Sequence, residues 1–156
     1  MRTLKLTLFY ILSFTWGCIM SLIGLVAIGI CACFGRVQVF HNRLYGHFGK
    51  NWGGLELGCF FICSDDCANN KYLCGHECGH GLQNIIWGPL FPLVIGIPSA
   101  ARYWWRELVI IKHKKHKDNP NSFWNKQYEN MPPYDSIWFE GQATEWGKKY
   151  ILTNKW

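Results

Sequence analysis

The sequence feature that most constrains this chain is an uncharged block near its N-terminus. No Asp, Glu, Lys, Arg or His occurs between Lys5 and Arg36, and small or apolar residues fill most of the interval. About 20 consecutive apolar residues suffice for a helix to cross a bilayer. The block is longer than the apolar core of a signal peptide, which has about 7 to 15 residues. It therefore predicts a retained transmembrane helix, with residues 1–35 as the anchor.

The composition agrees with an anchored protein that has one further domain. The chain has 156 residues, of which 49% are hydrophobic, 17% aromatic and only 17% charged. This length excludes a multidomain enzyme, and this apolar content excludes a disordered chain. The net charge of +6 suits anionic lipid headgroups or nucleic acid. Because no nucleic-acid-binding motif accompanies the charge, we expect membrane lipid as a partner and no nucleic acid.

Basic residues give a weak indication of the side of the membrane. Of the 16 Lys and Arg residues, all but Arg2 and Lys5 follow the anchor. Cytoplasmic segments beside a transmembrane helix carry an excess of such residues. We therefore expect a single-pass protein of the cell membrane whose part after the anchor, residues 36–156, is cytoplasmic.

A second uncharged stretch occupies residues 81–101. Its core contains three prolines and two glycines, which interrupt a continuous helix. Aromatic and basic residues follow it, as is typical where a segment leaves the membrane interface. We expect residues 85–105 to associate with the membrane without spanning it. The later basic run, residues 112–117, has two open interpretations, attraction to anionic lipid or a solvated loop.

The pentapeptide His76-Glu77-Cys78-Gly79-His80 has the pattern HExxH. On a helix, predicted here over residues 72–84, this spacing sets two imidazoles one turn apart on one face, where both can bind one zinc ion. Glu77 is then a general base that takes a proton from zinc-activated water and passes it to a leaving amine. The alternative is a pair of surface histidines.

A catalytic zinc ion usually has three protein ligands, so a third must lie downstream. His113 and His116 lie among lysines, whose positive charge opposes metal binding. Glu140 opens a predicted helix over residues 136–149 and is the better candidate, although it could also be a surface carboxylate. Three small residues share its helical face and would allow a close approach to the first helix: Ala143, Thr144 and Gly147.

These residues resemble the HExxH zinc metallopeptidases of the gluzincin type, in which a later helix provides a glutamate ligand. The resemblance extends to a group of small bacterial membrane proteins with a peptidase motif, through the segments Gly81-Leu82-Gln83, Gly88-Pro89-Leu90, Ile97-Pro98-Ser99 and Trp138-Phe139-Glu140. It covers about residues 50–147. It implies zinc ligands at His76, His80 and Glu140 and a general base at Glu77. One departure is Ala143, which stands where many gluzincins have an acidic residue.

Two further features have open interpretations. The run from Leu55 to Ile62 is predicted as a short strand, which is either ordinary core or an edge strand that pairs with an extended substrate. Tyr134 is a weaker candidate, as a hydrogen-bond donor to the oxyanion, and is not included in the predicted site.

Five cysteines also remain without an assigned role: Cys59, Cys63, Cys67, Cys74 and Cys78. Their spacing differs from the CxxC pairs of structural zinc sites, and helical periodicity or chance accounts for it. The odd number favours a reducing compartment. A disulfide between Cys59 and Cys67 and a second zinc site made of thiolates are the alternatives.

Together, these observations predict a mainly helical α+β protein. Residues 1–35 form the anchor, and residues 36–156 form a zincin-like metallopeptidase domain with a short strand or hairpin. The expected function is zinc-dependent hydrolysis of peptide bonds in a peptide or protein substrate, which could itself be membrane-bound. The alternative is a noncatalytic membrane adaptor that binds metal structurally or not at all.

Overall fold

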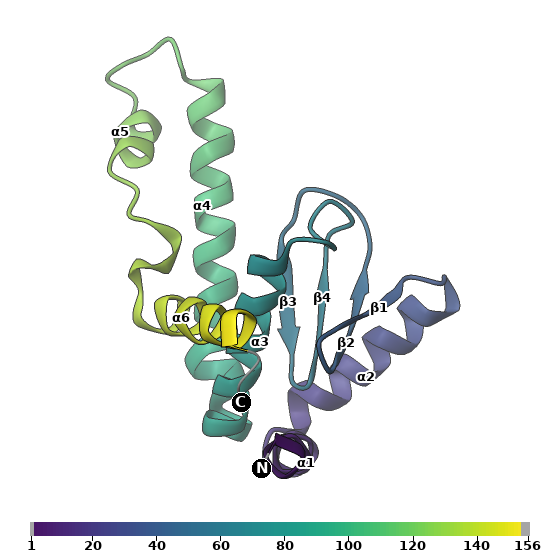
Figure 1. Cartoon of the computed structure of the whole chain (residues 1–156). Helices are drawn as coiled ribbons and strands as arrows, with labels where there is room; N and C mark the ends of the chain where they lie inside the picture. The colour runs from purple at the N-terminus through teal and green to yellow at the C-terminus, as the bar shows by residue number, and fades with distance from the viewer. Residues whose placement is uncertain (1, 154–156) are drawn as a thin grey trace.

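The computed structural model describes residues 2–153 as a mainly helical α+β fold with a small mixed sheet (Figure 1). The helices are α1 (Arg2–Phe14), α2 (Cys18–Cys33), α3 (Lys71–Trp87), α4 (Ile97–Lys115), α5 (Phe123–Glu129) and α6 (Trp138–Thr153). Shorter turns are the 3-10 helices η1 (Gly88–Leu90) and η3 (Tyr134–Ser136) and the π-helix η2 (Pro92–Gly96). The strands are β1 (Val37–Phe40), β2 (Arg43–His47), β3 (Gly54–Leu57) and β4 (Phe60–Cys63).

The strands form one sheet in the order β1-β2-β4-β3. β2 and β4 are parallel, whereas β1 pairs with β2 and β3 pairs with β4 in antiparallel hairpins. The predicted strand from Leu55 to Ile62 is therefore a hairpin, because the chain reverses at Gly58. This glycine has a φ of +77°, a conformation that other residues rarely adopt. The reversal leaves β3 at the edge of the sheet.

Strand β4 is buried on both faces and organises the core. Phe61 and Cys63 pack with Cys74 and Cys78 of α3 on one face of the sheet. Ile62 points to the opposite face and packs with Cys31 of α2. The period-2 alternation of a strand thus places α3 and α2 on opposite faces of the sheet.

Helix α2 contacts the sheet through small residues. Its buried residues are Ser21, Gly24, Ile28 and Cys31. A Cβ at Gly24 would lie 2.9 Å from the side chain of Phe60, so only a glycine allows this approach. Most of the larger apolar residues of α2 lie on its exposed face: Ile19, Leu22, Ile23, Leu25, Val26 and Ile30.

Both uncharged segments are bent. The predicted continuous N-terminal helix is instead α1 and α2, which meet at 93°. The expected interruption of residues 85–101 is present, as η1 and η2, and the chain turns by 118° there between α3 and α4. Within residues 2–153, no single helix has the length and apolar content needed to cross a membrane, although each bent pair meets that requirement when its two helices are combined.

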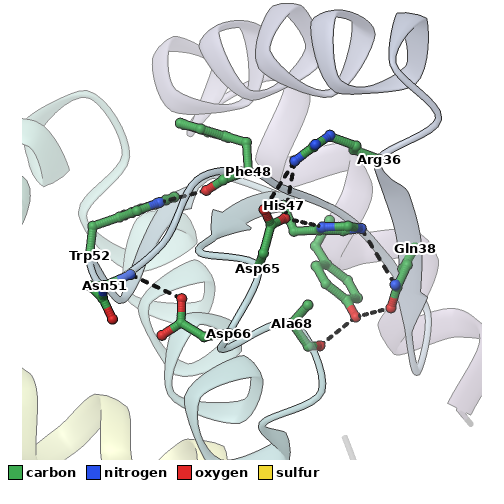
Figure 2. A network of polar contacts seen from close by, with 10 residues as sticks. Arg36, Gln38, His47, Phe48, Asn51, Trp52, Asp65, Asp66 and Ala68 are labelled. Carbon is green, nitrogen blue, oxygen red and sulfur yellow. Dashed lines mark hydrogen bonds and ion pairs between the residues drawn. The ribbon is translucent and has the colours of Figure 1, made fainter.

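A polar network holds the loop before α3 against the sheet (Figure 2). Asp65 in this loop accepts a hydrogen bond from Nδ1 of His47 at 2.7 Å and forms an ion pair with Arg36 at 3.1 Å. The hydroxyl of Tyr45 donates to the carbonyl of Ala68 at 2.6 Å. The loop ends at Asn70, whose side chain accepts from the N–H groups of two residues in the first turn and caps α3. This network fixes the start of the helix that carries the HExxH pattern.

Candidate metal centre

The two histidines of the HExxH pattern lie one turn apart on α3, as predicted. The Nε2 atoms of His76 and His80 are 3.1 Å apart, and their rings are perpendicular. His80 is 4% exposed and His76 is partly exposed. The pair therefore lies at the boundary between the core and an open space.

Glu140 of α6 completes the group. Its Oε2 atom lies 3.1 Å from Nε2 of His76 and 3.2 Å from Nε2 of His80. The Glu140 side chain is fully buried, which excludes a surface carboxylate. Within residues 2–153, these three residues form the only group of three or more potential metal ligands whose atoms converge.

Small residues on α3 and α6 allow the two helices to bring these ligands together. A Cβ at Gly79 would lie 2.8 Å from Cα of Ala143, and one at Gly147 would lie 2.8 Å from the backbone nitrogen of His76. Both distances are too short for a β-carbon. The predicted close approach at Ala143 and Gly147 is present.

The geometry fits a metal ion with nitrogen and oxygen ligands. Ligand distances of about 2.0–2.2 Å place the ligand atoms of a tetrahedral zinc site about 3.3–3.5 Å apart. The separations between the three ligand atoms, 3.1 to 3.2 Å, are close to this requirement. The three residues can therefore hold one metal ion with little movement.

Each histidine has a partner for its other ring nitrogen. Nδ1 of His76 lies 3.0 Å from the hydroxyl of Thr144, and Nδ1 of His80 lies 2.7 Å from Oε1 of Gln83. Gln83 in turn donates to the carbonyl of Phe139 at 2.8 Å, which ties α3 to the start of α6. Such contacts fix the tautomer and leave Nε2 free to bind a metal. Thr144 and Gln83 therefore orient the two imidazole rings through their Nδ1 atoms.

His80 and Glu140 stabilise each other's charged forms when no metal ion is bound. Burial lowers the pKa of His80, but the hydrogen bond to Glu140 and the charges of Glu77 and Glu140 outweigh it and raise this pKa to about 9. Burial raises the pKa of Glu140, yet hydrogen bonds from His76 and His80 make it lower than usual overall. An ionised Glu140 is what a metal site requires.

Glu77 lies beside the ligands but is not one of them. It is 5% exposed, and burial raises the pKa of its carboxyl, against the charges of His76 and His80. Its Oε1 atom would lie only 2.6 Å from a Cβ at Gly54, the first residue of β3. The carboxylate therefore lies against the backbone of the edge strand. A raised pKa suits a group that must take up and release a proton near neutral pH.

A cavity of about 220 Å³ opens beside this group, lined by His76, Glu77 and His80. Tyr134 and Glu56 also line it, and neither was in the predicted site. The ring of Tyr134 lies 6.2 Å from that of His76. Glu56 of β3 is 4% exposed and accepts from the Gly58 N–H at 2.5 Å, and burial raises its pKa to about 8. No sequence pattern marks Glu56, because its position depends on the pairing of β3 with β4.

The competing ligands lie elsewhere. His113 stacks on Tyr128 of α5, at 4.0 Å between ring centres, and its Nδ1 lies 2.8 Å from Oδ1 of Asn125. His116 is exposed at the end of α4. Neither belongs to the metal-binding group.

The five cysteines form no second site among the described residues. All are free thiols, so the disulfide between Cys59 and Cys67 is not formed. Four of them are buried, and burial raises the pKa of Cys63 and Cys74 to about 12. They are packed as neutral, apolar side chains.

Comparisons with protein-family models, with curated proteins and with solved structures give no match to this chain. The geometry alone therefore defines what is established: an α+β fold with a His-His-Glu group, on α3 and α6, that can bind a metal ion.

Proposed function

We propose that the protein is a membrane-associated zinc peptidase with His76, His80 and Glu140 as ligands and Glu77 as general base. The observation that carries the proposal is the position of Glu77. It is a buried carboxyl beside a three-ligand group, at the wall of a cavity, and its pKa is raised. A purely structural metal site has no use for such a carboxyl, since structural sites are closed by four protein ligands.

The chemistry assigns a role to each residue. Bound zinc supplies Lewis acidity that activates water and polarises a peptide carbonyl. Glu77 accepts a proton from the attacking water and delivers it to the nitrogen of the breaking C–N bond. The products are a carboxylate and an amine, and Glu77 returns to its ionised form.

The edge strand supports a peptide as substrate. β3 has one neighbour in the sheet, β4, and Gly54, Leu55 and Glu56 of β3 line the cavity. An extended peptide can add to such an edge through backbone hydrogen bonds. This arrangement would place a peptide bond beside Glu77, which already contacts Gly54.

The exposed apolar surface supports membrane association. Large hydrophobic residues are exposed along α1 and α2, and others are exposed at the bend after α3: Ile86, Leu90, Leu93 and Ile97. The two bends pack together, since the Asn84 amide donates to the Gly17 carbonyl at 3.3 Å. Exposed apolar residues gathered on neighbouring elements mark a membrane or protein contact. The absence of charge from both segments favours the membrane.

Metal analysis and a peptide-cleavage assay on detergent-purified protein test this proposal. The wild type, His116→Ala and Glu77→Gln should each contain about one zinc, whereas His76→Ala and His80→Ala should contain little. The wild type should cleave peptides from a mixed library, and 1,10-phenanthroline or Glu77→Gln should abolish cleavage. Activity that persists in Glu77→Gln would refute the mechanism. If the wild type binds zinc but neither it nor any variant cleaves peptides, the noncatalytic adaptor is favoured.

A further inference from the structure

We infer that the cavity beside the metal centre selects a peptide by one apolar side chain, of the size of Phe or Leu, next to the bond to be cut. This inference rests on the proposed peptidase function and adds the class of substrate. The metal centre itself cannot distinguish side chains, because its ligands and Glu77 act on the peptide backbone common to all substrates.

The size of the cavity suits one such side chain. Its volume is about 220 Å³. An apolar cavity of about 150 Å³ in another protein binds benzene. A phenyl or branched aliphatic group therefore fits here, with room for the first atoms of its backbone.

The walls of the cavity away from the metal are apolar and come from four parts of the chain. They are formed by Met20, Leu55, Phe91, Ile95, Ala100 and Trp104. Phe91 and Ile95 are at most 2% exposed and pack on Phe139, so this wall is held in place by the core. A rigid apolar wall raises the binding affinity for a side chain that fills the cavity and adds no affinity for alanine or glycine.

Charged side chains are disfavoured in this space. Glu56 and Glu77 line it, so an aspartate or glutamate of the substrate would bury a carboxylate beside groups that cannot pair with it. Among the described residues that line the cavity, none is Lys or Arg. A lysine would have to bury its ammonium group against apolar walls. The lysine compound is the sharpest test, because the Gly58 N–H holds only Oε1 of Glu56, and its buried Oε2 has no hydrogen-bond partner.

Gly96 provides a way to fill the cavity without disturbing the fold. It lines the cavity, its backbone is helical, and a Cβ there would meet only Phe91, at an ordinary 3.8 Å. A leucine at this position would extend into the space that the substrate side chain needs. Gly29 of α2 is the matched control, because it is exposed and a Cβ there would meet nothing within 4 Å.

The test measures binding as well as activity. Zinc-loaded protein is titrated calorimetrically with the hydroxamates of phenylalanine, alanine, lysine and aspartate, which share a metal-binding group and differ in side chain. Phenylalanine hydroxamate should bind at least about tenfold more tightly than each of the others, since one extra apolar group in a pocket is worth about 10- to 200-fold. Gly96→Leu should remove this preference and leave alanine hydroxamate within about threefold of its wild-type affinity. Gly29→Leu should change neither.

Several outcomes would overturn the inference. They are equal binding of all four compounds, no binding of any, tightest binding of the lysine compound, or a preference that survives in Gly96→Leu. If Gly96→Leu fails to fold, Gly96→Ala replaces it and should reduce the preference partially. Peptide cleavage without side-chain preference would leave the peptidase proposal intact and remove this inference. A binding preference without any peptide cleavage would support this inference and remove the peptidase proposal.

Discussion

At the scale of single residues, the contact between Glu77 and Gly54 sets the position of the proposed base. The two residues come from different elements, and the space between them admits no side chain at position 54. Glu77 also has to be buried, because burial is what raises the pKa of its carboxyl. A small substitution at Gly54 should therefore change the rate of the proposed reaction without contacting a metal ligand.

Gly54→Ala should lower peptide cleavage by about 100-fold while the zinc content stays at the wild-type level. The added methyl group would lie 2.6 Å from Oε1 of Glu77, so the carboxylate must move. A displacement of about 1 Å from the reactive geometry can cost a factor of about 100 in rate. The measurement pairs kcat with metal analysis, and Gly29→Ala is the control. Unchanged kcat in Gly54→Ala would contradict the role given to this contact.

The sequence predicted the residues whose spacing is local. His76, Glu77 and His80 follow from one helical turn, and Glu140 follows from the small residues on its own helical face. The contacts that position these residues depend on tertiary structure. Gly54 and Glu56 reach the site from the sheet, and no spacing in the sequence relates them to it, whereas Gln83 lies one helical turn after His80.

At the scale of elements, the packing of α3 against α6 decides whether the ligands meet. Gly79 and Gly147 each face the backbone of the opposite helix. The sequence predicted this close approach from the small residues of α6. It did not predict the bend between α1 and α2, because that bend depends on contacts of Trp16 and Gly17 with the end of α3, 70 and 67 residues away.

Gly147→Ala should destabilise the protein by roughly 1–3 kcal/mol, because extra atoms in a packed interface force the two helices apart. It should also weaken zinc binding, since Glu140 lies on the displaced helix. Glycine to alanine inside a helix otherwise stabilises by about 0.5–1 kcal/mol, so Gly29→Ala should be neutral or slightly stabilising. Thermal melting and zinc titration of both variants check this. Equal effects at the two positions would show that the helix contact is not tight.

The stability that the loop before α3 gives to the protein should depend on pH through Asp65. The hydrogen bond from His47, with Arg36 nearby, holds the pKa of the Asp65 carboxyl below its ordinary value of 3.8. A lowered pKa adds stability that is present above pH 3.8 and is lost as the pH falls through the folded-state value. The wild type should therefore melt at a higher temperature than Asp65→Asn at pH 7, and the gap should shrink as the pH falls below 3.8. A gap that stays constant across this range would contradict the pairing.

At the scale of the whole molecule, the metal centre constrains how the chain can lie in a membrane. The histidines precede the bent segment and Glu140 follows it, yet their ligand atoms are 3.1 to 3.2 Å apart. A full crossing by residues 85–101 would separate them by about 30 Å of hydrocarbon. The bend of 118° returns the chain instead.

Single cysteines placed at Asn69 and Asp118 in a cysteine-free variant should therefore react with an impermeant maleimide from the same side of the membrane. Both positions are exposed, one before α3 and one after α4. Labelling is compared in sealed and in permeabilised vesicles. Reaction from opposite sides would remove Glu140 from the metal centre and leave the two histidines without it.

The metal centre also closes a large loop of the chain. His80 and Glu140 are 60 residues apart in the sequence, and the segment between them contains η1, η2, α4 and α5. An ion bound by these residues would act as a removable cross-link, which would restrict the unfolded chain much as a disulfide does. A protease cut in the exposed turn at Asn119–Asn121 would leave two fragments that the ion and the α3–α6 contact still join. The segment formed by α4 and α5 could thus be cut while His80 and Glu140 stay in one particle, and removal of a bound metal ion would weaken that connection.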